Sequence, residues 1–318
     1  MEKSKGKIRI GIDARFYGPK GKGLGRYVQK LLQYLEEIED SNEREYFVFL
    51  RKDNFDLYHP KQKNFKKVLA DYAWYGFSEQ LLYPFFLSRH KLDLMHFCHF
   101  NVPVLYRKRF AVTIHDLILF HYPTVRNTTL NKLYYSIKLL CYRWVIKSAA
   151  RRALKIIAVS KFTKNDVIIN LKVPKEKIEM TYEGCDLLCH VPAISNDEIL
   201  EKYGIIKPYL LYVGNAYPHK NLEKLSSVFK HIRKERNQLS LVLVGGEDYF
   251  FERLKDHIKT NHIEGVVFPG FVPDEELDVL YREAELYVFP SLYEGFGLPP
   301  LEALTKSTPV VSSSRTSM

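Results

Sequence analysis

Residues 285–302 read Glu-Leu-Tyr-Val-Phe-Pro-Ser-Leu-Tyr-Glu-Gly-Phe-Gly-Leu-Pro-Pro-Leu-Glu. The apolar run over 285–290 is typical of a buried parallel strand, and the segment that begins at Pro299 is typical of a helix start. Between them, Gly295 and Gly297 allow the backbone to approach a ligand closely. The stretch therefore predicts a strand, a glycine loop and a helix whose first-turn N–H groups face an anion.

Two glutamates, Glu294 and Glu302, flank this glycine loop. Each has an ordinary explanation, because a first-turn acid offsets the helix dipole and a loop carboxylate is solvated. As a pair across a strand-loop-helix junction they indicate a ligand site. They resemble the E-x7-E motif of retaining glycosyltransferases of family 4, which have the GT-B fold. The flanking Phe289-Pro290-Ser291 and Ala303-Leu304 also fit that motif.

Short β-rich runs alternate with helical patterns along the chain, which is typical of parallel βαβ units with helices on both faces of a sheet. The pattern predicts strands at 7–12, 46–50, 93–97, 111–114, 155–159, 177–180, 209–213, 239–244, 266–268, 286–289 and 309–312. It predicts helices at 24–39, 130–150, 162–171, 222–236, 250–260 and 275–283.

The fold predicted from these elements is α/β, with two doubly wound, Rossmann-like domains facing a cleft. The 318 residues, 46% of them hydrophobic, suffice for two cores. We expect an N-terminal domain over 1–188, a linker over 189–206 and a C-terminal domain over 207–318. The resemblance implies that the first domain lies on the acceptor side and that the second binds a nucleotide sugar.

The resemblance also concerns the end of the chain at Met318. Family members continue with a further strand-helix unit and a helix that crosses back to the first domain. We therefore expect the second domain to be incomplete, with the strand at 309–312 an exposed edge or poorly ordered. Low stability and weak or absent activity would follow.

The chain is strongly basic, with a net charge of +11 and a pI near 9.2. Each basic run alone is an ordinary solvated face, but together with nearby aromatic residues they favour an anionic surface. No nucleic-acid-binding motif accompanies them, so nucleic acid is not expected as a partner. The basic runs are Lys61, Lys63, Lys66, Lys67; Arg89, His90, Lys91; Arg107, Lys108, Arg109; and Lys147, Arg151, Arg152, and the aromatics are Trp74, Tyr75, Phe77, Tyr83, Phe85 and Phe86.

No segment has the roughly 20 apolar residues of a spanning helix. Residues 1–6 are followed by a predicted strand and not by the apolar stretch of a signal peptide, so we expect no signal peptide. We expect a cytoplasmic protein with peripheral contact to an anionic membrane surface on the inner face of the cytoplasmic membrane. Cys98, Cys141, Cys185 and Cys189 lack a paired metal-binding spacing, so reduced thiols are expected. No Asp-x-Asp motif is visible, so we expect no metal and no cofactor.

A second glycine loop, Gly18-Pro-Lys-Gly-Lys-Gly-Leu-Gly-Arg26, follows the first predicted strand. It fails the G-x-G-x-x-G dinucleotide pattern because Arg26 stands where the third glycine belongs. A permissive turn would explain the glycines, and so would a loop that holds a phosphate or a sugar acceptor at a helix N-terminus. The resemblance implies that Gly23, Gly25 and Arg26 border the acceptor and the donor phosphates.

His115 and Asp116 end the predicted strand at 111–114. A lone histidine is more often structural. However, Thr-Ile-His-Asp-Leu-Ile, followed by Tyr122 and Pro123, resembles the His-Asp segment of the family. This likeness implies that His115 is catalytic, in contact with the reacting sugar or its acceptor, and that Asp116 lies in the acceptor and phosphate loop region.

The strand at 209–213 is followed by Gly214 and Asn215, and Lys220 stands at the start of the next helix. A lysine there can neutralise a departing diphosphate. Many family members have an arginine at the position of Asn215, whose amide could instead donate a hydrogen bond to a phosphate. The resemblance implies that Glu294, His115 and Lys220 are catalytic, and that the donor is bound by Gly214, Asn215, Gly295, Phe296, Gly297, Leu298, Glu302 and Val272.

The resemblance, which covers nearly the whole chain, implies a retaining glycosyltransferase. It would move a hexose such as mannose from GDP-mannose or a UDP-hexose to a glycan or a lipid-linked acceptor. A nucleotide-sugar-binding scaffold protein without turnover and a nucleotide-sugar epimerase are the alternatives. A dinucleotide oxidoreductase is disfavoured by the broken glycine pattern.

Overall fold

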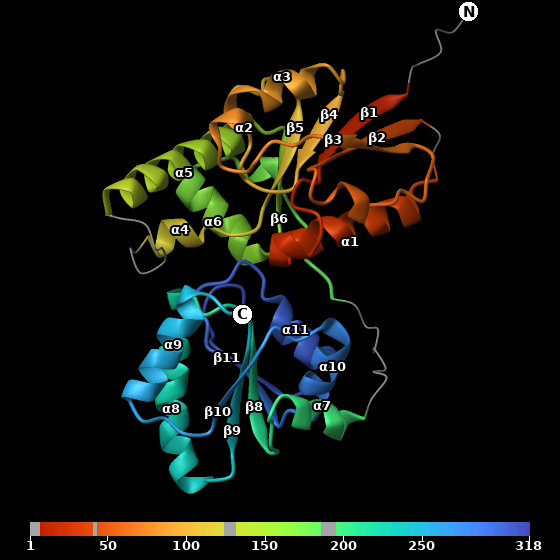
Figure 1. The fold of residues 1–318 in the computed structure, drawn as a ribbon. Coiled ribbons are helices and arrows are strands. Elements are labelled where there is room, and N and C mark those ends of the chain that lie inside the picture. The colour runs from red at the N-terminus through yellow and green to blue at the C-terminus, as the bar shows by residue number, and fades with distance from the viewer. Residues whose placement is uncertain (1–6, 41–42, 124–131, 186–194) are drawn as a thin grey trace, which may run out of the picture. The chain divides into compact units, whose positions relative to one another are not determined.

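The computed structural model describes residues 7–40, 43–123, 132–185 and 195–318. The chain divides into two compact units (Figure 1). The first comprises Met1–Leu117 and Ser136–Tyr182, and the second comprises Ile118–Tyr135 and Glu183–Met318. Among the described residues, no helix is long and apolar enough to cross a membrane.

The first unit contains a seven-stranded parallel sheet in the order β3-β2-β1-β4-β5-β6-β7. From β1 the chain adds strands first on one side, to β3, and then on the other side, from β4 to β7, so the strand order reverses between β1 and β4. Ligands of such sheets bind at this switch point, outside the carboxyl ends of the strands. The strands are β1 (Ile8–Asp13), β2 (Arg44–Leu50), β3 (Phe65–Leu69), β4 (Leu94–Phe97), β5 (Phe110–Ile114), β6 (Lys155–Ala158) and β7 (Ile178–Met180).

Helices cover this sheet mainly through buried apolar side chains. In α1 (Lys22–Ile38), Val28 and Leu32 are four residues apart and completely buried. The α6 helix (Lys161–Leu171) begins where the Ser160 hydroxyl accepts from the N–H of Thr163. The remaining helices that lie in the first unit, wholly or for the most part, are α2 (Phe77–Leu81), α3 (Tyr83–Ser88) and α5 (Lys132–Arg152).

The second unit contains a five-stranded parallel sheet in the order β10-β9-β8-β11-β12. Here the direction reverses between β8 and β11, which places a second switch point beside the Glu294 loop. The strands are β8 (Tyr209–Val213), β9 (Ser240–Val244), β10 (Val266–Gly270), β11 (Leu286–Phe289) and β12 (Val310–Ser312). The helices are α4 (Ile118–His121), α7 (Asn196–Lys202), α8 (Leu222–Glu235), α9 (Tyr249–Thr260), α10 (Asp274–Glu283) and α11 (Leu298–Thr305).

The sequence predicted the α/β class, the parallel sheets and most elements correctly. It missed β3, because Lys66 and Lys67 broke the apolar pattern. In the structure β3 is an edge strand, where Lys66 pairs with Glu45 and Lys67 lies over the ring of Phe55. The prediction that 309–312 forms an edge strand is confirmed by β12.

The compact units divide the chain differently from the ranges predicted from the sequence. Residues 118–135 belong to the second unit, although they lie inside the predicted first domain. The α7 helix, inside the predicted linker, buries Ile199 and Leu200 in the core of the second unit. An apolar pair on one face gives this short helix a packing partner, so it does not behave as a linker.

Candidate functional site

An ion pair lies at the switch point of the second unit. Lys220 ends the 3-10 turn after β8, and Glu294 lies in the loop between β11 and α11. The Lys220 Nζ donates to Glu294 Oε1 at 2.5 Å, and the two side chains are only 13% and 11% exposed. The ammonium group also lies 5.5 Å from the ring centre of Phe289. A largely buried positive charge is therefore held at the edge where ligands of such sheets bind.

The glycine loop beside this pair has the expected strand-loop-helix form. Gly297 has φ +101°, a left-handed conformation that favours glycine, and it precedes the first residue of α11. The helix begins at Leu298, so Pro299 and Pro300 occupy its second and third positions. Proline has no N–H. The donors that this helix start offers an anion are thus the N–H groups of Gly297 and Leu298, and not those of a full first turn as predicted.

Residues after β12 hold this loop in place. The Glu294 N–H donates to Thr316 Oγ1 at 3.0 Å, and the Ser317 hydroxyl donates to the carbonyl of Phe296 at 2.8 Å. These contacts fix the backbone on both sides of Gly295. The Glu294 carboxylate is therefore presented by an ordered loop.

The second glutamate, Glu302, lies on α11, the helix that follows the glycine loop. The Tyr281 hydroxyl donates to Glu302 Oε2 at 3.1 Å. Burial raises the pKa of Tyr287 well above its ordinary value, and the carboxylates of Glu302 and Glu294 raise it further. Both carboxylates therefore lie near one buried tyrosine of β11.

The turn after β8 is shaped by close backbone approaches. Gly214 has φ +150°, and a Cβ there would lie 2.8 Å from the Tyr212 hydroxyl. That hydroxyl donates to the carbonyl of Asn215 at 2.8 Å. The Asn215 Oδ1 accepts from the N–H of Tyr217 at 3.3 Å. The side chain of Asn215 is thus oriented by its oxygen, and its Nδ2 is the group it can offer as a donor to a ligand.

The segment that follows the His-Asp pair packs in the second unit, beside Glu294. The Tyr122 hydroxyl donates to the carbonyl of Leu292 at 3.3 Å, and the ring of His121 stacks on that of Tyr293 at 4.9 Å. The ring of Tyr122 also lies 6.4 Å from that of buried His219. Burial and the adjacent Lys220 charge lower the pKa of His219 to about 3, so it is neutral at pH 7. Sequence reasoning named Tyr122 only as a flank of the His-Asp segment. It assigned no role to Tyr293 or His219, although these directly precede Glu294 and Lys220.

His115 lies at the carboxyl end of β5, in the first unit. Its Nε2 is 3.0 Å from the carbonyl of Cys98, and because a carbonyl only accepts, Nε2 carries the proton. Its ring meets the edge of Tyr27 at 4.6 Å. The hydroxyl of Tyr27 is in turn 3.1 Å from Thr113 Oγ1, to which His96 Nε2 also lies at 2.9 Å. Residues of α1, β4 and β5 thus set the orientation of the imidazole.

A buried charge cluster lies at the carboxyl end of β1. Arg15 is 1% exposed and donates from Nε and Nη2 to the two oxygens of Asp13, both at 2.8 Å. Its Nη2 also donates to Glu79 Oε1 at 2.7 Å. The other oxygen of Glu79 accepts from the Tyr75 N–H at 2.8 Å and from Asn101 Nδ2 at 2.6 Å. Two buried carboxylates therefore share one guanidinium, an arrangement that no local sequence pattern indicates.

Comparison with known proteins connects both units to one family. A profile for Glycosyltransferase Family 4 matches residues 21–187, and one for glycosyl transferases group 1 matches residues 195–318. The chain belongs to Glycosyltransferase Family 4. It is a glycosyltransferase, as the E-x7-E motif predicted.

Relatives of this family 4 chain include two O-antigen enzymes. It is 27% identical to the O-antigen chain mannosyltransferase RfbU of Salmonella typhimurium, over 93% of this chain and 79% of the relative. It is 29% identical to O-antigen chain mannosyltransferase B of Escherichia coli, over 87% of this chain and 68% of the relative. Among solved structures, Anabaena HepE in complex with UDP and glucose matches with a TM-score of 0.69 at 18% identity, covering 98% of this chain and 82% of that chain. The GT-B fold predicted from the motif is thereby confirmed.

The structure gathers the predicted residues of this family 4 chain into two groups. In the second unit, Gly214, Asn215, Lys220, the loop 294–298 and Glu302 all lie around the carboxyl ends of β8 and β11. In the first unit, Gly23, Gly25 and Arg26 lie at the start of α1, next to the Tyr27 that contacts His115, and Asp116 follows that histidine. Val272 is 3% exposed and packed in the core, so a ligand would reach its backbone and not its side chain.

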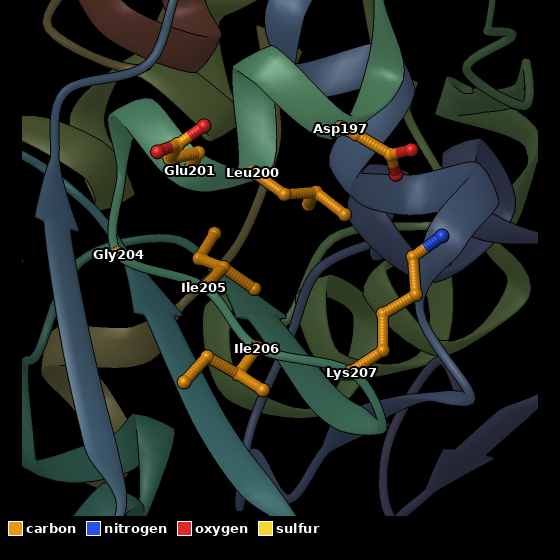
Figure 2. Close-up of a pocket in the computed structure, with 7 residues that line it drawn as sticks. All are labelled: Asp197, Leu200, Glu201, Gly204, Ile205, Ile206 and Lys207. Carbon is orange, nitrogen blue, oxygen red and sulfur yellow. The ribbon is translucent and has the colours of Figure 1, made fainter.

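A pocket of about 400 Å³ in the second unit lies away from these residues. Figure 2 shows Asp197, Leu200 and Glu201 of α7 above Ile205 and Ile206, with Lys207 beside them. Lys207 precedes the amino end of β8, whereas Lys220 and Glu294 follow the carboxyl ends of β8 and β11. This pocket is therefore on the opposite edge of the sheet from the candidate site.

Two glycines of the first loop provide a matched test of its packing. A Cβ on Gly25 would lie 2.0 Å from the carbonyl oxygen of Gly18 and 2.7 Å from that of Phe16, whereas a Cβ on Gly23 would meet nothing within 4 Å. We expect Gly25→Ala to displace the loop and lower the free energy of unfolding by about 2 kcal/mol, within the usual range for overpacking. Gly23→Ala is expected to be neutral or to stabilise the helix by up to about 1 kcal/mol. Chemical denaturation of both variants checks this, and equal effects would contradict it.

Proposed function

We propose that this glycosyltransferase transfers a hexose, with retention of its anomeric configuration, from a nucleotide diphosphate sugar to a glycan or a lipid-linked acceptor. The observation that carries the proposal is the Lys220–Glu294 ion pair beside the glycine loop. The mannosyltransferase relatives favour mannose as the sugar and GDP-mannose as the donor.

The leaving diphosphate needs positive charge and N–H donors. Lys220 supplies the charge, and Gly297, Leu298 and the Nδ2 of Asn215 supply donors. Because Glu294 already neutralises Lys220 in this structure, a diphosphate competes with that carboxylate for the ammonium group. Binding of the donor then releases Glu294 from Lys220 and lets it contact the donor sugar.

The two carboxylates take different roles in this proposal. Glu302, held by Tyr281, binds the ribose hydroxyls of the nucleotide. Glu294 and the loop amides position the hexose as its anomeric carbon becomes oxocarbenium-like. Lys220 and the N–H groups compensate the diphosphate charge, so the proposal requires no divalent metal. In this proposal His115, at the carboxyl end of β5, contacts the reacting sugar or its acceptor.

A donor screen tests the proposal. The purified chain is incubated with GDP-mannose, UDP-glucose or UDP-galactose, with and without a bacterial membrane extract as acceptor source and with and without EDTA. We expect acceptor-dependent release of GDP from GDP-mannose that EDTA does not reduce. Conversion of the donor sugar without an acceptor would instead support an epimerase. Donor binding with no release of nucleoside diphosphate would support a binding protein without turnover, and both results would overturn the proposal.

A further inference from the structure

The α5 helix of the first unit has an apolar face that the described residues do not cover. Ile137, Leu140 and Trp144 are spaced by three and four residues, so they lie on one side of the helix, and they are 52%, 65% and 61% exposed. The opposite side packs into the unit through Ile146 and Ala149, which are completely buried. The helix is therefore apolar on both sides, although one of them faces solvent. Contiguous exposed apolar surface of this kind marks an interaction site.

Neighbouring elements extend this surface. On α2 and α3, Phe77, Leu82 and Phe85 are 88%, 58% and 64% exposed, and Leu105 in the loop between β4 and β5 is 43% exposed. The loop joins α2 to α5, because the Val104 N–H donates to Gln80 and the Arg152 guanidinium donates to the carbonyl of Pro103. Figure 1 likewise shows α2 next to α5. We call these seven side chains on α2, α3, α5 and the loop the apolar face.

Basic residues accompany the apolar face, and the one acidic residue of its elements, Glu79 on α2, is completely buried. The sequence has no aspartate or glutamate at 80–92, 94–115 or 117–165, a span that includes all of α3, α5 and the connecting loop. The exposed basic residues of the same elements are Arg89, Arg107, Lys108, Arg109, Lys138 and Arg151. Two copies of such a surface would repel one another, so charge disfavours self-association.

We propose that the apolar face docks onto an anionic lipid bilayer, with its aromatic and aliphatic side chains in the interfacial region and its basic residues against the lipid headgroups. Exposed Trp, Phe and Leu side chains with basic neighbours are the combination that such an interface binds. The inference deepens the proposed function, because a lipid-linked acceptor would be met at that surface. Only the link to a lipid-linked acceptor rests on the proposed function, because docking on a bilayer does not require sugar transfer.

Vesicle co-sedimentation tests the docking. The purified protein is mixed with vesicles of phosphatidylcholine alone or of phosphatidylcholine and phosphatidylglycerol at seven to three. We expect sedimentation with the anionic vesicles only. Each basic residue near the surface contributes about fivefold to the partition coefficient, so changing Arg107, Lys108 and Arg109 together to Gln should weaken binding about a hundredfold. Leu140→Ser and Trp144→Ser should each weaken it about tenfold.

Ile38→Ser is the matched control, because Ile38 is 74% exposed on α1 and is flanked by Glu37 and Glu39. It should bind vesicles as the unchanged protein does, and thermal melts verify that each variant is folded. Equal binding to neutral and anionic vesicles, or unchanged binding by Trp144→Ser, would overturn the proposal. A concentration-dependent dimer that Trp144→Ser dissociates, with no vesicle binding, would assign the face to a second copy instead.

The test is independent of the proposed function. A Glu294→Gln variant should bind vesicles normally while transferring sugar about a thousandfold more slowly. If the unchanged protein releases GDP in the donor screen but binds no vesicles, the docking inference fails and the proposed function stands. If it binds vesicles but releases no GDP, the proposed function fails and the docking inference stands.

Discussion

Glu294→Gln is expected to lower kcat for sugar transfer about a thousandfold, a loss typical of removing one electrostatic contact to a transition state. Glutamine keeps the shape of the side chain, so Thr316 and Ser317 should still hold the loop through its backbone. The change removes the charge that pairs with Lys220 and that would face the developing oxocarbenium ion. Binding of GDP, measured by calorimetry, should stay the same or tighten, because the phosphate no longer competes with a carboxylate for Lys220.

The variant Lys220→Met tests the role of the positive charge in the same ion pair. It should weaken GDP binding and lower kcat by two to three orders of magnitude, because a buried cation at the leaving group is lost. Since the two side chains form one ion pair, their effects should be far from additive in the double variant. Additive losses, or a Glu294→Gln enzyme that keeps more than one tenth of its kcat, would contradict the assigned roles.

Arg15→Met is expected to destabilise the first unit by about 3–5 kcal/mol, the cost of leaving buried charges without their partner. The guanidinium and the carboxylates of Asp13 and Glu79 are at most 6% exposed. Both tryptophans, Trp74 and Trp144, lie in the first unit, so intrinsic fluorescence during chemical denaturation reports on that unit. Lys155→Met is the control, because its pair with Glu179 is 46% and 60% exposed and should contribute less than about 1 kcal/mol.

The loss of unfolding free energy caused by Arg15→Met should become smaller as the pH falls from 8 to 5.5. Burial raises the pKa of Glu79 above its ordinary value, and Arg15 counteracts part of that rise. Without Arg15 the folded-state pKa is higher still. Between the unfolded and the folded pKa the native state binds more protons than the unfolded state, so stability increases as pH falls. A pH-independent deficit would show that the carboxylates are not desolvated charges in the variant.

The sequence was most informative where function depends on local order along the chain. The Glu294 loop and Lys220 each follow a strand of the second sheet, and His115 follows a strand of the first. Parallel strands of one sheet bring their carboxyl ends to one edge, so the group of residues within each unit could be predicted from motifs and topology. The missed contacts join distant positions. The hydrogen bonds from Arg15 to Glu79 and from Tyr122 to Leu292 depend on tertiary packing, which no local sequence pattern indicates.

The start of α11 shows a further limit of pattern reading. Two prolines after the glycine loop marked a helix start correctly, but which N–H groups remain depends on the exact first residue. Because the helix begins at Leu298, both prolines fall within its first turn and remove two donors. The missed α2 and α3 helices are too short for a periodic signal, and their exposed aromatic residues resemble a loop in sequence.

The anomeric configuration of the product tests the central claim most directly. The chain would be given GDP-α-mannose and the acceptor identified in the donor screen, and proton and carbon NMR would measure the one-bond coupling at the new anomeric centre. We predict an α-linked mannosyl product, which is retention. A β-linked product would contradict the retaining mechanism that assigns Glu294, the glycine loop and Lys220 their roles.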